Sequence, residues 1–353
     1  MTSPQPVAGS RPSTLIDSVE QFGASFDAAA AHVGVIERNI LLAGYRIRLQ
    51  FAGPALVPVI EPAFDHLAED DGEQPADLTV RVWDAASTDV RPLPLPADVL
   101  HRGETGPRYH GEDRGIVVHA ADATLSVLDA RGKTALHYLP DAKNALWYQK
   151  ATPLKDIVHA WTSGHDIQLI HAAAVGNRDG GVLIAGVAGA GKSTTSVACL
   201  RGGLAYAGDD YVLVDIGRAF VHSLYSSAKL EWDNFDRHPE LFRPGNSRAD
   251  PKAVAFLARD VPDRMAHGFP LRALLLPAIT GREETRAVPT TTSRALLGLA
   301  PSTMLQMPGH DQQSLGAMAR LVDGVPAFQL ELGTDLSAIP DVVEAVLADV
   351  TGR

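Results

Sequence analysis

The sequence has few cysteines, no long apolar runs and no repeats, as is usual in ordinary globular proteins. It has a single cysteine, Cys199, so no disulfide can form within the chain, as is usual in a reducing compartment. We interpret Cys199 as a small buried apolar residue. The sequence lacks any apolar run of about 18 residues or more, so no transmembrane helix is predicted. Internal repeats and low-complexity tracts are also absent, which excludes solenoid and fibrous classes.

Positive charge is scarce as well. The chain has 31 Lys and Arg residues against 42 Asp and Glu residues, giving a formal net charge of −11. Nonspecific binding to nucleic acid or to an anionic membrane needs a basic surface, so we expect neither kind of partner. A single anionic nucleotide needs only a local site and is not excluded. Together with the lone cysteine, this composition predicts a cytoplasmic protein.

The length of 353 residues and the 45% hydrophobic content predict two domains with real cores. Residues 1–13 are polar and proline-rich without an apolar signal-peptide core, and we expect a flexible tail there. Residues 14–150 predict a smaller α+β domain. Its predicted helices cover 14–32 and 56–67, and its predicted strands cover 45–51, 78–83, 115–119, 123–128, 134–138 and 144–149.

This N-terminal region shows no catalytic pattern. Residues 84–114 are rich in proline, glycine and charge, which predicts irregular structure. His101, His110 and His119 are scattered without metal-ligand spacing, and Asp70-Asp71 is typical of a solvated loop. By elimination, we expect this domain to recognise a substrate or a partner.

Residues 152–353 predict an α/β domain. The predicted helices cover 152–163, 194–201, 293–299, 312–322 (with Asp311 as N-cap) and 339–349. The predicted strands cover 167–175, a run from 181, 204–206, 211–215, part of 221–230, 272–276 and 327–332. Residues 231–263 are polar and are expected to be irregular.

The second domain is arranged around a glycine loop. Residues 186–193 read GVAGAGKS, which fits G-x-x-x-x-G-K-[ST] between a predicted strand and a predicted helix. Glycines let the backbone approach a polyphosphate closely, and successive N–H groups at a helix N-terminus attract anions. Lys192 can reach the outer phosphates, and the Ser193 hydroxyl can bind Mg²⁺. The alternative is a chance glycine turn. The predicted nucleotide-binding residues are Gly186, Ala188, Gly189, Ala190, Gly191, Lys192, Ser193 and Thr194.

Phosphate binding alone does not distinguish a kinase from a switch, because transfer also needs a proton acceptor and metal ligands. Asp209-Asp210, after the loop helix and the next strand, is the best candidate pair. Gly208-Asp209-Asp210 is equally good β-turn chemistry, so spacing alone leaves both interpretations open. His171, on the strand before the loop, is either a core histidine or part of the site.

The stretch from 171 to 215 resembles the C-terminal catalytic domain of HPr kinase/phosphorylase. That family has a histidine ahead of a G-x-x-G-x-G-K-S loop and an Asp-Asp pair beyond the following helix and strand. His171, residues 186–193 and Asp209-Asp210 match it at corresponding intervals. The resemblance implies a P-loop kinase domain of the HPr kinase/phosphoenolpyruvate carboxykinase type, which uses ATP and Mg²⁺. It also implies a homo-oligomer, because the HPr enzymes are hexamers.

The resemblance also implies roles for these residues. Asp209 would be the general base, Asp210 and Ser193 would bind the metal, and His171 would support the charge. The stretches HAAAVG, GGVLIAG and GDDY are similar to HPr-kinase-like proteins of peptide-modifying pathways, some of which phosphorylate a serine of a precursor peptide. The N-terminal half shows no such likeness.

Three further cations are candidate contacts for the transferring phosphoryl group or an anionic substrate, namely Lys229, Arg243 and Arg248. Each arginine could equally be a solvated surface charge, whereas Lys229 lies between apolar residues and is better placed. The leading hypothesis is a kinase acting on a hydroxyl, namely a serine of a peptide or protein. The alternatives are a kinase of a small molecule (a sugar, a polyol or free serine) and a nucleotide-dependent regulatory module without transfer activity.

Overall fold

The protein is described by a computed structural model that covers residues 15–69, 74–92, 101–103, 106–111, 115–121, 123–306 and 312–352. Its chain forms two compact units. The N-terminal unit contains the described residues up to Glu37, Leu49–Leu56 and Leu78–Lys143. The C-terminal unit contains Arg38–Arg48, Val57–Asp77 and the chain from Asn144 onward. Residues 57–67 belong to the C-terminal unit because they bond to its residues 223–226, for example through His66 Nε2 and Ser223 Oγ at 2.7 Å.

The N-terminal unit is built on a mostly antiparallel sheet. Helix α1 (Leu15–Val33) places Phe22 and Phe26 against Trp83, with ring centroids 4.8 and 6.1 Å apart. The sheet order is β4-β9-β8-β7-β6-β5, in which β4 and β9 are parallel and the other pairs antiparallel. The elements are β4 (Leu78–Asp84), α3 (Ala85–Thr88), β5 (His101–Gly103), β6 (Gly106–Gly111), β7 (Ile116–Ala121), β8 (Thr124–Asp129) and β9 (Thr134–Leu139).

Strands β1 (Val35–Leu42) and β2 (Tyr45–Ala52) have residues in both units. The first half of the C-terminal unit comprises α2 (Val57–Phe64), β3 (Ala68–Glu69), α4 (Trp147–Ala151), α5 (Lys155–Thr162), β10 (Ile167–Ile170), β11 (Ala173–Asn177), β12 (Gly180–Ile184), α6 (Lys192–Arg201), β13 (Ala205–Gly208), β14 (Val212–Asp215), β15 (Phe220–His222) and β16 (Ser227–Leu230). The second half comprises α7 (Trp232–Phe235), β17 (Ala253–Phe256), α8 (Leu257–Asp260), β18 (Gly268–Ile279), β19 (Arg286–Pro289), α9 (Thr292–Gln306), α10 (Gln312–Gly324), β20 (Ala327–Leu332) and α11 (Ile339–Thr351), with short 3-10 turns that include η5 (Leu336–Ala338).

The central sheet of the C-terminal unit determines where the chemistry can be placed. Strands β12, β18 and β20 are mutually parallel neighbours, and β11 pairs antiparallel with both β12 and β13. Strand β13 therefore runs in the same direction as β12. The carboxyl ends of β12 and β13 and the start of β11 consequently lie at one edge of the sheet, where α/β proteins usually bind ligands.

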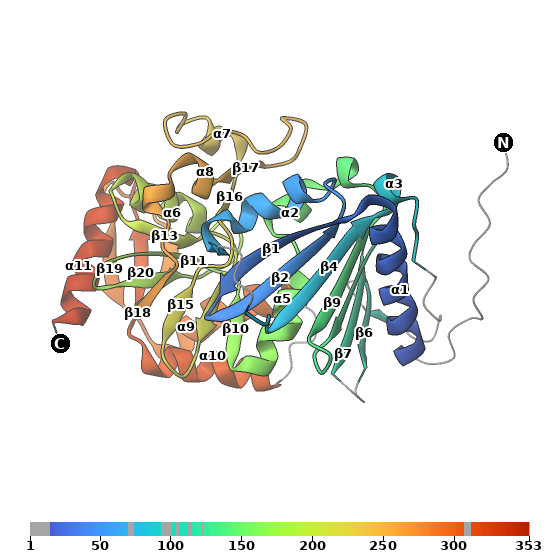
Figure 1. Ribbon diagram of the computed structural model, residues 1–353. Coiled ribbons are helices and arrows are strands. Elements are labelled where there is room, and N and C mark those ends of the chain that lie inside the picture. The colour runs from blue at the N-terminus through green and yellow to red at the C-terminus, as the bar shows by residue number, and fades with distance from the viewer. Residues whose placement is uncertain are drawn as a thin grey trace. The chain divides into compact units, whose positions relative to one another are not determined.

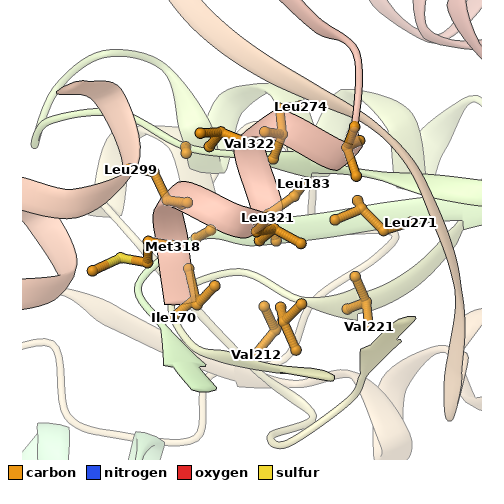
Figure 2. Packing of buried hydrophobic residues seen from close by; sticks show 14 of the residues in the cluster. Ile170, Leu183, Val212, Val221, Leu271, Leu274, Leu299, Met318, Leu321 and Val322 are labelled. Atoms are coloured by element: carbon orange, nitrogen blue, oxygen red, sulfur yellow. The ribbon is translucent and has the colours of Figure 1, made fainter. Parts of the chain in front are cut away.

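Helices cover this sheet on both faces. On one face α9 and α10 bury Leu299, Met318 and Leu321 against Leu183 and Val212, as Figure 2 shows. On the other face α6 and α11 pack on residues such as Val182 and Leu330. Within this unit, Figure 1 shows α11 (red) and α6 on the opposite side of β18 and β20 from α9 and α10. Strands β10 and β12 are buried along their whole length, which explains their apolar sequences.

The predicted α/β class of this region is confirmed, and Cys199 is fully buried as interpreted, with burial and then Glu344 raising the pKa of its thiol to about 12. Four local predictions were wrong. Residues 144–149 contain the start of α4 and no strand, and 167–175 forms two strands separated at His171. The segments 84–114 and 231–263 hold regular elements (α3, β5 and β6; α7, β17 and α8). Strands β1 and β19 were not predicted.

The expected tail 1–13, Asp70-Asp71 and the N-cap Asp311 lie outside the described residues. Helices in the described part of the chain are all too short or too polar to cross a bilayer.

Candidate active site

The glycine loop has positive φ angles at its three glycines. It connects β12 to α6, and Gly186, Gly189 and Gly191 have φ angles of 154°, 79° and 106°. Side chains rarely tolerate these angles, so glycine is required at each of the three positions. A Cβ on Gly191 would also lie 2.5 Å from Leu332 Cδ1 of the neighbouring strand β20. Val187, Ala188 and Gly189 are exposed at the tip of the loop.

Lys192, the first residue of α6, folds back over the loop. Its Nζ donates to the carbonyl oxygens of Gly186 at 2.8 Å and Val187 at 3.3 Å. Burial lowers the pKa of this ammonium, while Asp210 and Asp209 act in the opposite direction and Lys252 adds to the lowering. If a phosphate were bound in the loop, the ammonium could donate to a charged oxygen instead of to these two neutral carbonyls, and that contact would be stronger.

The two aspartates follow β13 at the same sheet edge as the loop, but they face different partners. Asp209 is 3% exposed, and its Oδ1 accepts a hydrogen bond from Ser196 Oγ of α6 at 2.9 Å. The Ser193 side chain also acts on this carboxyl and lowers its pKa. The backbone N–H of Lys229 donates to its Oδ2 at 3.3 Å. Asp209 is thus held directly beneath the first turn of α6.

Asp210 is bound by two side chains from other elements. Its Oδ1 accepts a hydrogen bond from His171 Nε2 at 2.9 Å, and its Oδ2 is in contact with Lys229 Nζ on β16. His171 occupies the break between β10 and β11, and its backbone N–H donates a hydrogen bond to Thr303 Oγ1 of α9 at 3.2 Å. The strand break that the sequence pattern did not predict therefore positions the histidine.

These surroundings move the pKa values of the two carboxyls in opposite directions. Burial, and then the negative Asp210, raise the pKa of Asp209 above its ordinary value, against the hydrogen bonds from the serines. Burial would also raise the pKa of Asp210. The Lys229 ammonium and His171 outweigh that effect and hold this pKa far below its usual range. Of the two, Asp209 is therefore the better proton acceptor.

The donor set fits a hard cation such as Mg²⁺. The Ser193 hydroxyl and the Asp209 carboxylate are adjacent oxygen groups next to the phosphate loop, with Asp210 following in sequence. Among the described residues, no group of three or more His, Cys, Asp or Glu side chains is arranged to hold a metal. Such a cation would thus need further ligands from a nucleotide or from water, which is the usual situation for Mg²⁺.

The three candidate cations are in different surroundings. Lys229 is part of the site, with its Nζ 5.4 Å from the ring centre of Tyr211 and 5.9 Å from that of Trp147. Arg243 forms an ion pair with Asp260 at 2.8 Å. Arg248 forms one with Asp236 at 2.6 Å and stacks over Trp232. Among the described residues, neither arginine forms a hydrogen bond or ion pair with the loop or with Asp209 and Asp210.

Several residues of this network were missed by sequence reasoning. Ser196 lies one helical turn beyond Lys192, so helical spacing could have shown that it faces the same side as the loop. Thr303 and Trp147 are distant in sequence and carry no local signal. Lys252 lies in a segment that was predicted to be irregular, yet it is near enough to influence Lys192.

Comparison with known proteins gives limited information. No family model and no curated protein sequence matches the chain. Among solved structures, the chain is similar to the Hpr(Ser) kinase/phosphatase from Coxiella burnetii, with 11% identity and a TM-score of 0.24. The match covers 52% of this chain and 95% of that one. A likeness of this size assigns no substrate and no activity.

Proposed function

We propose that the protein is an ATP- and Mg²⁺-dependent kinase that transfers the γ-phosphoryl group to a hydroxyl. The observation that carries the proposal is the position of Asp209. It is a buried carboxylate with a raised pKa, and it is hydrogen-bonded to Ser196 on the helix that begins with Lys192. A phosphate loop and a poised proton acceptor within one hydrogen-bonded network are what phosphoryl transfer needs. In this proposal the domain is a P-loop kinase of the HPr kinase/phosphoenolpyruvate carboxykinase type.

Each residue then has a role. Backbone N–H groups of the loop and the Lys192 ammonium bind the phosphates and hold them in line with the acceptor. Asp209 accepts the proton of the incoming hydroxyl. Lys229 and His171 keep Asp210 ionised, so that its charge stays in the site without competing for that proton. Ser193 and Asp210 are the oxygen donors that would hold Mg²⁺, which would neutralise charge on the phosphates.

We further propose a serine of a peptide or protein as the acceptor. The support is the similarity of the stretches HAAAVG and GDDY to HPr-kinase-like proteins of peptide-modifying pathways. The half-buried Trp147 beside Lys229 is compatible with a peptide acceptor, since aromatic residues are favoured where peptides bind.

The test is phosphoryl transfer from γ-labelled ATP, with Mg²⁺, to a pool of serine-containing peptides. Asp209→Asn should lower the rate by at least about 100-fold while nucleotide still binds. Asp84→Asn is the matched control, because Asp84 is equally buried (1% exposed) but caps α3 in the N-terminal unit. It should lose stability and keep the activity per folded molecule.

The outcomes separate the three functions. A labelled peptide supports the proposal. A label found only on an added sugar, polyol or free serine would show that the acceptor is a small molecule and not a peptide. ATP binding without any labelled product, with every acceptor tried, would show a regulatory module and overturn the kinase. Equal activity of Asp209→Asn and the wild type would remove Asp209 from its role.

A further inference from the structure

A pocket of about 200 Å³ opens beside α6, next to the phosphate loop. Thr194, Ala198 and Arg201 line one wall. They are spaced four and three residues apart, so they lie on one face of the helix. Thr194 directly follows Ser193 of the loop motif, and Arg201 lies about 10 Å farther along the helix at 1.5 Å per residue. The pocket therefore starts where the phosphate loop ends and continues along α6.

The opposite wall is apolar and firmly placed. It is formed by Leu336 and Pro340, at η5 and the start of α11. Gly202, which also lines the pocket, fixes this wall: a Cβ there would lie 2.3 Å from Pro340 Cβ, so the end of α6 and the start of α11 are in close contact. This apolar wall, with the Ala198 methyl group on the opposite side, suits a flat ring.

The polar groups of the pocket are neutral or part of ion pairs. Asn234 of α7 offers an amide with both donors and an acceptor, and the Ser337 hydroxyl, which donates to Asp335 at 2.6 Å, keeps acceptor capacity. His238 is 7% exposed, and its Nδ1 has no hydrogen-bond partner among the described residues. Burial, and then Arg201, lower its pKa, so the ring is neutral at pH 7. Such a set matches the edge of an uncharged heteroaromatic base.

We propose that this pocket binds the nucleoside of the nucleotide whose phosphates lie on residues 186–193, with the base between Ala198 and Pro340 and its edge at Asn234. Arg201 cannot serve as a second phosphate site as it stands, because Glu240 lies 3.7 Å from its guanidinium. This inference rests on the proposed nucleotide binding. It assigns to the pocket the recognition of the nucleoside, which ATP has and a bare polyphosphate lacks.

The experiment compares two probes on the full chain, ATP and inorganic tripolyphosphate, by calorimetric titration with Mg²⁺. The wild type should bind ATP at least about 10-fold more tightly than tripolyphosphate. Ala198→Leu, which fills the pocket, and Asn234→Ala should each lower ATP affinity about 10-fold and leave tripolyphosphate affinity unchanged. Asp233→Ala is the matched control on α7, since Asp233 is exposed and does not line the pocket.

The results distinguish failure of this inference from failure of the proposed function. If the wild type binds neither probe, nucleotide binding itself is refuted. Two results would refute the nucleoside pocket but leave phosphate binding by the loop intact. One is equal affinity of the wild type for ATP and tripolyphosphate. The other is that Ala198→Leu and Asn234→Ala leave both affinities unchanged, or lower both by the same factor. Because Asn234 is only half-buried, Asn234→Ala remains informative should Ala198→Leu fold poorly.

Discussion

The Nε2 of His171 lies 2.9 Å from Oδ1 of Asp210, although 39 residues separate them in the chain. The contact exists because β11 begins, and β13 ends, at the same edge of the sheet. With Lys229 on its other oxygen, Asp210 has one ionic and one hydrogen-bonding partner. Two carboxylates that are neighbours in sequence thereby acquire opposite electrostatic properties.

The first prediction concerns His171. His171→Phe keeps an aromatic ring of similar size and removes the hydrogen bond to Asp210. Loss of a bond to a charged group costs about 1.5–3 kcal/mol, so kcat/KM should fall roughly 10- to 100-fold. The pKa of Asp210 should rise toward that of Asp209, so the acid limb of the pH–rate profile, which Asp209 sets in the wild type, should become steeper as both carboxyls are protonated.

His159→Phe is the control for this variant, because His159 is also buried (5% exposed) but lies on α5. It should leave the profile unchanged per folded molecule. A His171→Phe enzyme with the wild-type rate and profile would show that the contact is structural only.

The second prediction concerns stability and the Lys229–Asp210 pair. The two side chains are 14% and 22% exposed, so removing the lysine leaves a partly buried, uncompensated charge, and Lys229→Met should lower the free energy of unfolding by about 2 kcal/mol at pH 7. The pKa of Asp210 is lowered in the folded state, so the pair stabilises the fold above the ordinary carboxyl pKa of 3.8. This stabilisation is lost as the pH falls toward the folded-state value.

The measurement is urea unfolding of both proteins between pH 7 and pH 3. The gap between wild type and Lys229→Met should be widest above pH 5 and should narrow below pH 4. Arg243→Met is a suitable comparison because its ion pair with Asp260 involves an arginine side chain that is 67% exposed. It should cost less than about 1 kcal/mol. A constant gap at all pH values would contradict the electrostatic explanation.

The sequence predicted those parts of the site that depend on neighbours in the chain. The glycine loop is a local motif, and its three glycines have the positive φ angles that the motif requires. Asp209-Asp210 could be placed at a strand end by counting elements. The sequence could not predict which of the two aspartates faces α6 and which faces Lys229. That depends on the position of β16, which carries Lys229 and pairs with β17, a strand more than 20 residues further along a polar segment.

The failed predictions have a common physical cause. Residues 167–175 form one apolar run, and periodicity cannot reveal that the chain breaks at His171 and that β10 pairs with β14 while β11 pairs with β12. Strand β17, Ala253–Phe256, is too short for its pattern to stand out among polar residues. The pocket beside α6 combines residues from three distant segments, and only the folded chain brings Asn234 and Pro340 together.

The third prediction separates backbone strain from crowding in the loop. Gly189 and Gly191 both have positive φ angles, but a Cβ on Gly189 would meet no atom within 4 Å. Gly191→Ala combines the same strain with a 2.5 Å contact to Leu332. We expect Gly189→Ala to cost about 1 kcal/mol of stability and Gly191→Ala to cost about 1–2 kcal/mol more. Chemical unfolding measures both, and equal costs would show that the loop shifts away from β20 freely.

The fourth prediction concerns Lys192, whose ammonium is held by the carbonyls of Gly186 and Val187. Lys192→Met keeps the apolar stem and removes only the charge, so the fold should survive. Affinity for ATP and for tripolyphosphate should fall together, by at least about 10-fold, because a charge-assisted contact with phosphate is worth roughly 1.5–3 kcal/mol. Lys192→Arg should not restore it, since the planar guanidinium cannot occupy the position between those two carbonyls. Calorimetric titration gives both affinities. If Lys192→Met weakened ATP alone, the lysine would act on the nucleoside and the phosphates would have to lie elsewhere.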